Sequence, residues 1–194
     1  MKKIGDRAFL HCSSLTSIKI PNSVTRIGDF AFRGCNGLTS IEIPDSVTII
    51  GLCAFEGCSA LIKINVSSDN SVYMAEGNCL LDKVGKKLLV GCKDSVISKG
   101  VTDIGACAFA GCSDLSSIEI PNSVTNIGQD AFRGCNGLSE LRIMGKSPET
   151  MEHLFSRSGL NELENITLYV PIGTGYAYRH NAFFAKFKEI IPKL

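Results

Sequence analysis

Residues 4–26 read IGDRAFLHCSSLTSIKIPNSVTR, and residues 27–49 repeat this text as IGDFAFRGCNGLTSIEIPDSVTI. A third copy begins at Ile50, and the motif returns at Ile104 and Ile127. Within each block, successive copies begin 23 residues apart. A fixed period of this length is typical of stacked repeats, in which each unit buries its apolar face against its neighbours. The sequence therefore predicts a solenoid of 23-residue coils.

Within one coil, alternating apolar and polar residues predict a short strand. In LTSIKI (residues 15–20), the leucine and both isoleucines are expected to point inward, whereas Ser17 and Lys19 face solvent. Pro21 cannot donate a ladder hydrogen bond, so the strand should end there. Because the coils repeat this segment, we expect the strands to pair in one parallel sheet, about 4.8 Å apart.

Two kinds of side chain are expected to form columns inside the coils. The phenylalanines of the motif predict a stacked spine: Phe9, Phe32, Phe55, Phe109, Phe132 and Phe155. Five of the nine cysteines share one inward position of the repeat: Cys12, Cys35, Cys58, Cys112 and Cys135. Cys53 and Cys107 share another position. Because free cysteine is among the most buried residue types, we expect reduced, inaccessible thiols, with disulfides or a bound metal as the alternatives.

Charge and apolar patterning argue against several classes of protein. The 194 residues include 20 Lys and Arg and 19 Asp and Glu, without the basic cluster that is typical of nucleic-acid binding. Apolar runs are only a few residues long, so membrane insertion is not expected. The repeat begins by residue 4, and the chain shows no signal peptide. We therefore expect either a cytosolic protein or a segment of a longer precursor, and we favour the second.

No group of residues forms a recognisable catalytic or metal-binding motif. His11, His153 and His180 are scattered, and the acidic residues recur with the period of the coil instead of converging on one point. Cys79 or Cys92 could be an exposed thiol, but no histidine lies nearby in the sequence to activate it. We expect no enzymatic activity, no cofactor and no metal site.

The consensus IGxxAFxGCxxLxxIxIPxSVTxIG, found across residues 4–66 and 97–143, resembles the BspA-like, or Treponema-pallidum-type, leucine-rich repeats. Residues 166–190, ITLYVPIGTGYAYRHNAFFAKFKEI, are similar to the C-terminal end of that family, with Phe183 or Phe184 where tryptophan is common. The resemblance implies a leucine-rich repeat solenoid, a β-rich horseshoe of the α/β class. It also implies a cell-surface or secreted protein that serves in adhesion or recognition.

We expect one domain, with the solenoid over residues 1–170 and a C-terminal cap over 171–194. A variant coil at 67–97 is longer than the period and lacks the IGxxAFxGC motif. Its apolar runs at 80–81 and 88–90 flank a polar turn and predict a β-hairpin. The hairpin is either a contact element or only a variant coil. Residues 176–187 predict a short amphipathic helix, with Tyr176, Phe183, Phe184 and Phe187 covering the end of the core.

The outward strand positions are the candidate protein-binding residues, on the expected concave face: Ser17, Lys19, Ser40, Glu42, Lys63, Asn65, Ser117, Glu119, Glu140 and Arg142. In the last coil we place Asn165 and Thr167 at the same positions. These residues are small or mixed in charge and offer few of the Tyr, Trp and Arg anchors of a typical hot spot. We expect either a module that binds a protein or another extracellular macromolecule, or a structural stalk without a ligand site. The first coil lacks a polar cap, so self-association through this edge is a further expectation.

Overall fold

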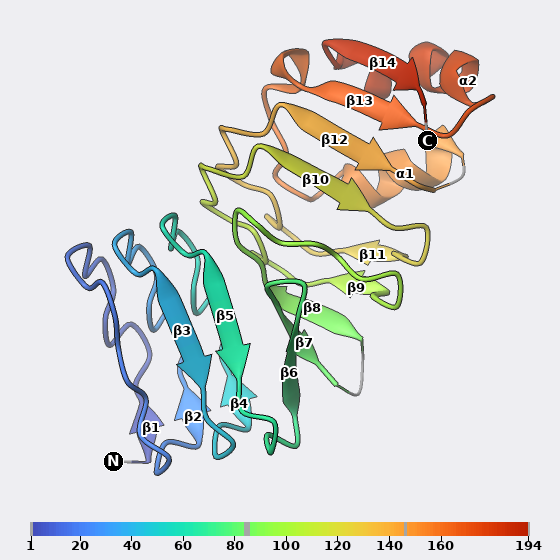
Figure 1. Cartoon of the computed structure of the whole chain (residues 1–194). Helices are drawn as coiled ribbons and strands as arrows, with labels where there is room; N and C mark the ends of the chain where they lie inside the picture. The colour runs from blue at the N-terminus through green and yellow to red at the C-terminus, as the bar shows by residue number, and fades with distance from the viewer. Residues whose placement is uncertain (1, 84–85, 146, 194) are drawn as a thin grey trace.

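The computed structural model describes residues 2–83, 86–145 and 147–193. These residues form an elongated solenoid, with the N-terminus at one end and the C-terminus at the other (Figure 1). The regular coils contain an LxxIxI segment, which forms a strand in every coil but the first, then a turn after the proline, a second short strand, and the tight IGxxAFxGC turn. The predicted leucine-rich repeat solenoid is therefore confirmed.

The LxxIxI strands form two parallel sheets, where one was expected. In the N-terminal half, β3 (Ser40–Ile43) pairs with β5 (Lys63–Val66). In the C-terminal half the order is β10, β12, β13 and β14, which span Ser117–Ile120, Glu140–Ile143, Thr167–Val170 and Glu189–Pro192. Residues 15–20 form no strand, although Thr39 N still donates to Thr16 O in that coil.

A second series of short parallel strands was not predicted. The strands are β1 (Lys3–Ile4), β2 (Arg26–Ile27), β4 (Ile49–Ile50), β9 (Asp103–Ile104) and β11 (Asn126–Ile127). Three of them, β2, β4 and β11, follow an S-V-T segment, and β1 and β9 occupy the equivalent position in their coils. Their threonines extend the ladder, because Thr48 Oγ1 donates to Thr25 O and Thr125 Oγ1 donates to Thr102 O. These hydrogen bonds give the recurring threonine a structural role between adjacent coils.

The phenylalanine spine consists of two stacks. The Phe9, Phe32 and Phe55 rings stack at centroid distances of 5.1 and 5.2 Å. A second stack contains Phe109 and Phe132, also 5.2 Å apart, and continues to the tilted ring of Phe155. The two stacks belong to separate hydrophobic cores, which the variant coil divides.

The variant coil is a three-stranded antiparallel meander of β6 (Tyr73–Glu76), β7 (Cys79–Asp82) and β8 (Lys87–Val90). It contains the expected hairpin, and β6 is an additional strand. Neighbouring residues of β7 face opposite ways, so Leu80 packs in the N-terminal core and Leu81 in the C-terminal core. The meander therefore lies between the two cores (Figure 1).

The C-terminal segment contains helix α2 (Gly175–His180), the 3-10 helix η2 (Phe184–Lys186) and strand β14, whereas the sequence predicted only a helix. Tyr178 is fully buried, and its hydroxyl donates to Gly145 O at 3.2 Å. Tyr176, which we expected in the core, is 73% exposed. The preceding coil contributes α1 (Pro148–Phe155), capped by Ser147 Oγ, and the 3-10 helix η1 (Leu163–Asn165).

Candidate functional site

The predicted binding residues fall into two groups, one on each side of the meander. In the N-terminal group, Ser40 pairs with Lys63 and Glu42 pairs with Asn65 across β3 and β5. In the C-terminal group, Ser117 pairs with Glu140 and Glu119 pairs with Arg142 across β10 and β12. All ten side chains are exposed or half-buried, and none is buried: Ser17, Lys19, Ser40, Glu42, Lys63, Asn65, Ser117, Glu119, Glu140 and Arg142. We call the outer side of these strands the strand face.

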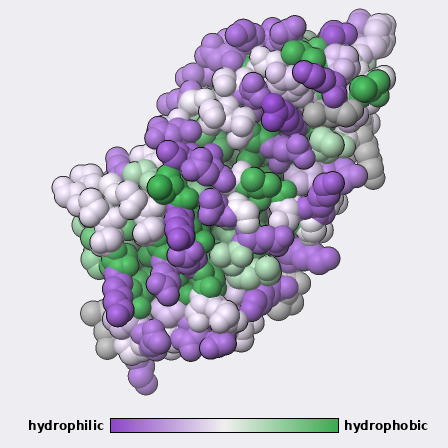
Figure 2. Space-filling view, viewed as in Figure 1, coloured by the Kyte–Doolittle hydropathy of each residue, from purple (hydrophilic) through white to green (hydrophobic). Residues whose placement is uncertain are grey.

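A hollow of about 500 Å³ lies on the N-terminal part of the strand face. Four predicted residues line it: Lys19, Ser40, Glu42 and Asn65. Asn22 and Asp45 contribute further polar groups at the turns that follow the strands. Figure 2 shows hydrophilic side chains interspersed with hydrophobic ones over this side of the molecule. The hollow therefore offers hydrogen-bonding groups of both charges but no aromatic side chain.

The C-terminal part of the strand face has an aromatic and cationic cluster. The Arg142 guanidinium lies 5.1 Å from the centroid of the Tyr169 ring. Its NH2 group also contacts Glu140 Oε2 at 2.7 Å. Tyr and Arg are the residues that contribute most to many protein interfaces. The cluster brings these two residue types into contact on neighbouring strands of the strand face.

Tyr169 is not among the predicted binding residues, because the sequence predicted the strand of the last coil two residues too early. The structure pairs Thr167 with Glu140 and Tyr169 with Arg142. Asn165, which we expected on a strand, ends η1 instead. Phe155, at the end of α1, keeps the 23-residue spacing from Phe132, but the segment with η1 that follows it is longer than in the other coils, so the period could not locate the strand. The alternation T-L-Y-V, with Leu168 and Val170 buried, was the available signal.

A disulfide joins the two halves of the molecule at Cys53 and Cys107. This corrects the expectation that every cysteine is a free thiol. The turn at 50–58 stacks directly on the turn at 104–112, because the variant coil has no turn of its own there: Gly57 N donates to Ala110 O at 2.8 Å. The same hydrogen bond joins the equivalent atoms of Gly34 and Glu56 one coil earlier. We call the contact between these two turns the junction.

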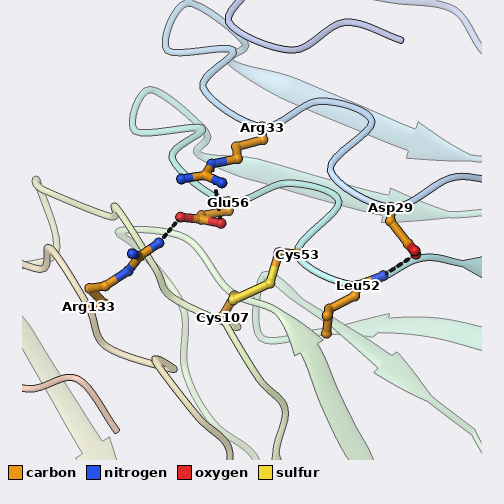
Figure 3. Close-up of a disulfide and its surroundings, with 7 residues drawn as sticks. All are labelled: Asp29, Arg33, Leu52, Cys53, Glu56, Cys107 and Arg133. Atoms are coloured by element: carbon orange, nitrogen blue, oxygen red, sulfur yellow. Dashed lines mark hydrogen bonds and ion pairs between the residues drawn. A yellow bond between two sulfur atoms is a disulfide. The ribbon is translucent and has the colours of Figure 1, made fainter. Parts of the chain in front are cut away.

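A buried carboxylate connects three coils beside this disulfide. Glu56 is 8% exposed and contacts two arginines at equivalent repeat positions (Figure 3). The Arg33 Nε atom lies 3.4 Å from Glu56 Oε2, and Arg133 NH2 donates to Glu56 Oε1. Arg133 does not belong to the coil that adjoins Glu56 on this side but to the one after it. The adjoining coil has the small side chain of Ala110 at the same repeat position. The two guanidinium groups compensate the buried charge of Glu56.

The inward cysteine column is largely as expected. Cys35, Cys58 and Cys135 each donate to a carbonyl of the preceding turn, as in Cys58 Sγ to Phe32 O at 3.2 Å. Cys112 Sγ donates to Gly91 O instead, at 3.7 Å. Burial raises the pKa of the Cys58 and Cys135 thiols to about 12. Cys12 is the exception in this column, because it is exposed. Cys79 and Cys92, considered above as exposed thiols, are both buried.

Potential metal ligands gather at one place in the described part of the chain, at Cys53, Glu56 and Cys107. A cavity of about 220 Å³ adjoins them and is also lined by Lys87 and Leu89.

None of the described helices is long and apolar enough to cross a membrane.

Stacked coils with parallel LxxIxI strands define the leucine-rich repeat class of proteins. The model of the BspA-type leucine-rich repeat region matches six copies over residues 2–80 and 82–183. The chain therefore belongs to the BspA-type leucine-rich repeat family.

Two solved bacterial structures share this fold. One is a leucine-rich cell surface protein of Faecalibacterium prausnitzii, with 25% identity and a TM-score of 0.65 over the whole of this chain and 57% of that one. The other is the pneumococcal vaccine antigen PcpA, with 15% identity and a TM-score of 0.62 over the whole of this chain and 66% of that one. The chain thus spans less than two thirds of the length of either structure. No curated protein matches it in sequence.

Proposed function

We propose that this chain is a non-enzymatic binding module of a cell-surface or secreted protein, and that it engages a protein or another extracellular macromolecule through the strand face. Membership of the BspA-type family supports a repeat module for protein interactions. The surface location of the similar Faecalibacterium prausnitzii protein supports the proposed location, and adhesion is the role we propose there.

The observation that carries the proposal is the row Glu119, Arg142 and Tyr169, which lies in register across β10, β12 and β13. These side chains present a carboxylate, a guanidinium and a phenol on neighbouring strands at one level of the sheet. The strands themselves are anchored by the buried Ile118, Leu141 and Leu168. A preorganised cluster of this kind can bind a partner without the entropic cost of ordering a loop.

The proposal can be tested with a matched pair of variants. The strand-face variant is Arg142→Ala with Tyr169→Ala, which removes the cation–π pair. The control is Gln129→Ala with Arg157→Ala, a polar pair joined at 3.3 Å outside the strand face. Each protein is immobilised and exposed to a panel of purified extracellular matrix proteins. We expect the wild type and the control to retain the same species, and the strand-face variant to lose it.

Equal retention by both variants would overturn the strand face as the binding surface. If the wild type retains only the species that an unrelated immobilised protein also retains, the chain is a structural stalk instead. The stalk is the second candidate function, and it is supported by the near-identity of the coils. It predicts that the strand-face variant and the control retain the same proteins.

Self-association through the first coil is a further proposed interaction. Three apolar side chains there are half-buried, whereas their counterparts one coil later are fully buried: Phe9, Leu15 and Ile18 against Phe32, Leu38 and Ile41. A second copy of the chain could cover these side chains by packing its own first coil against this one. Sedimentation velocity over a range of concentrations tests this. A dimer that Ile18→Lys abolishes would support it, and a monomer at every concentration would contradict it.

A further inference from the structure

The side chains at the junction combine two sulfur atoms with one carboxylate. The Sγ atoms of Cys53 and Cys107 and one carboxylate oxygen of Glu56 all lie within 4.8 Å of one another. The three residues come from two turns that are distant in sequence, and both turns are held in register by the Gly57–Ala110 hydrogen bond. The cavity of about 220 Å³ beside them is lined by all three residues.

We propose that reduction of the Cys53–Cys107 disulfide converts the junction into a binding site for one thiophilic divalent cation, with zinc as the cation that suits it best. Two thiolates and a carboxylate are ligand types that zinc accepts, at about 2.3 Å for sulfur and about 2.0–2.2 Å for oxygen. The Cα atoms of the two cysteines lie 5.3 Å apart, so both sulfurs can reach a shared ion once the bond between them is broken. Water from the adjoining cavity completes a tetrahedral set.

The two arginines fit this site as supports for the carboxylate. Ligating carboxylates are usually held by outer hydrogen bonds that set their orientation. Arg33 and Arg133 each take one oxygen of Glu56, which leaves further lone pairs on both oxygens. With two thiolates, one carboxylate, two guanidinium groups and a divalent cation, the cluster carries a net charge of +1. Without the cation, the same thiolate form carries −1.

The chemistry of the conversion balances with a reductant of the dithiol or phosphine class. The S–S bond accepts two electrons and two protons and becomes two thiols. A dithiol reductant is itself oxidised to a disulfide, whereas a phosphine takes up the oxygen of one water molecule. Zinc then displaces the two thiol protons, which pass to solvent. Metal binding is therefore coupled to reduction, and it is favoured by rising pH because protons are released.

The other cysteines do not offer such a site. Six of them are buried and hydrogen-bonded to backbone carbonyls: Cys35, Cys58, Cys79, Cys92, Cys112 and Cys135. Burial keeps thiols of this kind protonated at neutral pH, and a protonated thiol is a poor metal ligand. Cys12 is exposed but is a single thiol at the far end of the solenoid. A signal from reduced protein can therefore be assigned to the junction by substitution.

Cobalt(II) is the probe for the experiment, because thiolate coordination gives it a charge-transfer absorption. The full chain is prepared with the disulfide intact and after reduction by a phosphine, and both forms are titrated with cobalt(II). We expect the reduced protein to bind one cobalt(II) ion per chain with thiolate-to-metal absorption, and added zinc to displace it. The oxidised protein should show no such absorption.

Three variants locate the site. Cys53→Ser should abolish the charge-transfer absorption, and Glu56→Gln should weaken binding by about 10-fold or more, as expected when a group that shapes a metal site is lost. Cys12→Ser should change nothing. The inference is overturned if reduced wild type shows no thiolate–cobalt absorption, or if Cys53→Ser retains it. The oxidised wild type is a folded control, so the outcome does not depend on the folding of any variant. The result is also independent of the strand-face proposal.

Discussion

Cys53 and Cys107 are 54 residues apart in the sequence, but their Cα atoms lie 5.3 Å apart at the junction. The residues between them include the whole meander, which is held between the two cores. The disulfide therefore closes a loop around the variant coil. Its main effect should be on the stability of the connection between the two halves.

Reduction of this disulfide should lower the free energy of unfolding by about 4 kcal/mol, from the loop entropy of a cross-link of this length. Urea unfolding of the oxidised and reduced forms, both with a chelator present, measures the difference. The double variant Cys53→Ser with Cys107→Ser should match the reduced form. Identical midpoints for all three proteins would show that the bond is absent in solution or contributes nothing.

Truncation of the phenylalanine spine should destabilise the protein according to position. Phe32 is fully buried between two stacked rings, so Phe32→Ala should cost about 3–5 kcal/mol. Phe9 is half-buried and has a ring on one side only, so Phe9→Ala should cost less. Chemical denaturation of both variants tests the order. A larger loss at Phe9 would contradict the stacking argument.

Loss of both arginine partners of Glu56 should cost more than the two single losses together. Arg33→Ala or Arg133→Ala leaves one guanidinium to compensate the buried carboxylate. The double variant leaves the carboxylate without either, and removing the partner of a buried charge costs about 3–5 kcal/mol. Because the arginines are partly exposed, we expect the low end of this range. A double-mutant cycle in urea measures the coupling, and additive losses would exclude a shared role.

The buried thiols should make the protein less stable at alkaline pH. Burial raises the pKa of Cys58 from 9.0 to about 12, so the folded state holds this proton more tightly than the unfolded state does. Its contribution is fully present below pH 9 and is lost as the pH rises toward 12. Urea unfolding between pH 8 and about pH 11 in reductant should show this decline. Cys58→Ala should make the decline shallower, and an unchanged slope would contradict the assignment.

The C-terminal segment should be needed for solubility. β14 pairs with β13 along its full length, and Tyr178 and Phe184 are fully buried against the last coil. Deleting residues 171–194 would expose β13 and its apolar neighbours, which invites pairing with other chains. We expect light scattering to show aggregation of the truncated protein. A soluble truncation of unchanged stability would contradict this role.

The period in the sequence predicted those parts of the fold that depend on neighbouring coils. The inward isoleucines, the Phe32 column and the Cys58 column could be assigned because each position repeats every 23 residues. The strand pairs Ser40–Lys63 and Ser117–Glu140 follow from the same spacing. The outward residues could therefore be assigned to one face of the strands. The spacing did not predict that the meander divides these strands into two sheets.

What the period could not predict lies where the repeat is interrupted. Cys53 and Cys107 share a repeat position, but only the missing turn of the variant coil brings them into contact. Tyr169 was missed because the segment between Phe155 and β13, which contains η1, is longer than in the other coils and shifts the register of the strand. Leu80 and Leu81 of β7 pack in different cores, because β7 has a core on each side. The sequence of the strand alone does not specify this arrangement.

The position of β7 and β8 between two cores also limits which changes of length the protein can accept. The backbone of each regular coil pairs with that of its immediate neighbours, so another 23-residue coil inserted among residues 4–49 would leave the meander and its disulfide unaltered. Duplication of the coil at 104–126 would also leave the disulfide in place, but it would move Arg133 one coil further from Glu56. The two arms can therefore vary in length by whole coils, while the angle at which they meet stays constant.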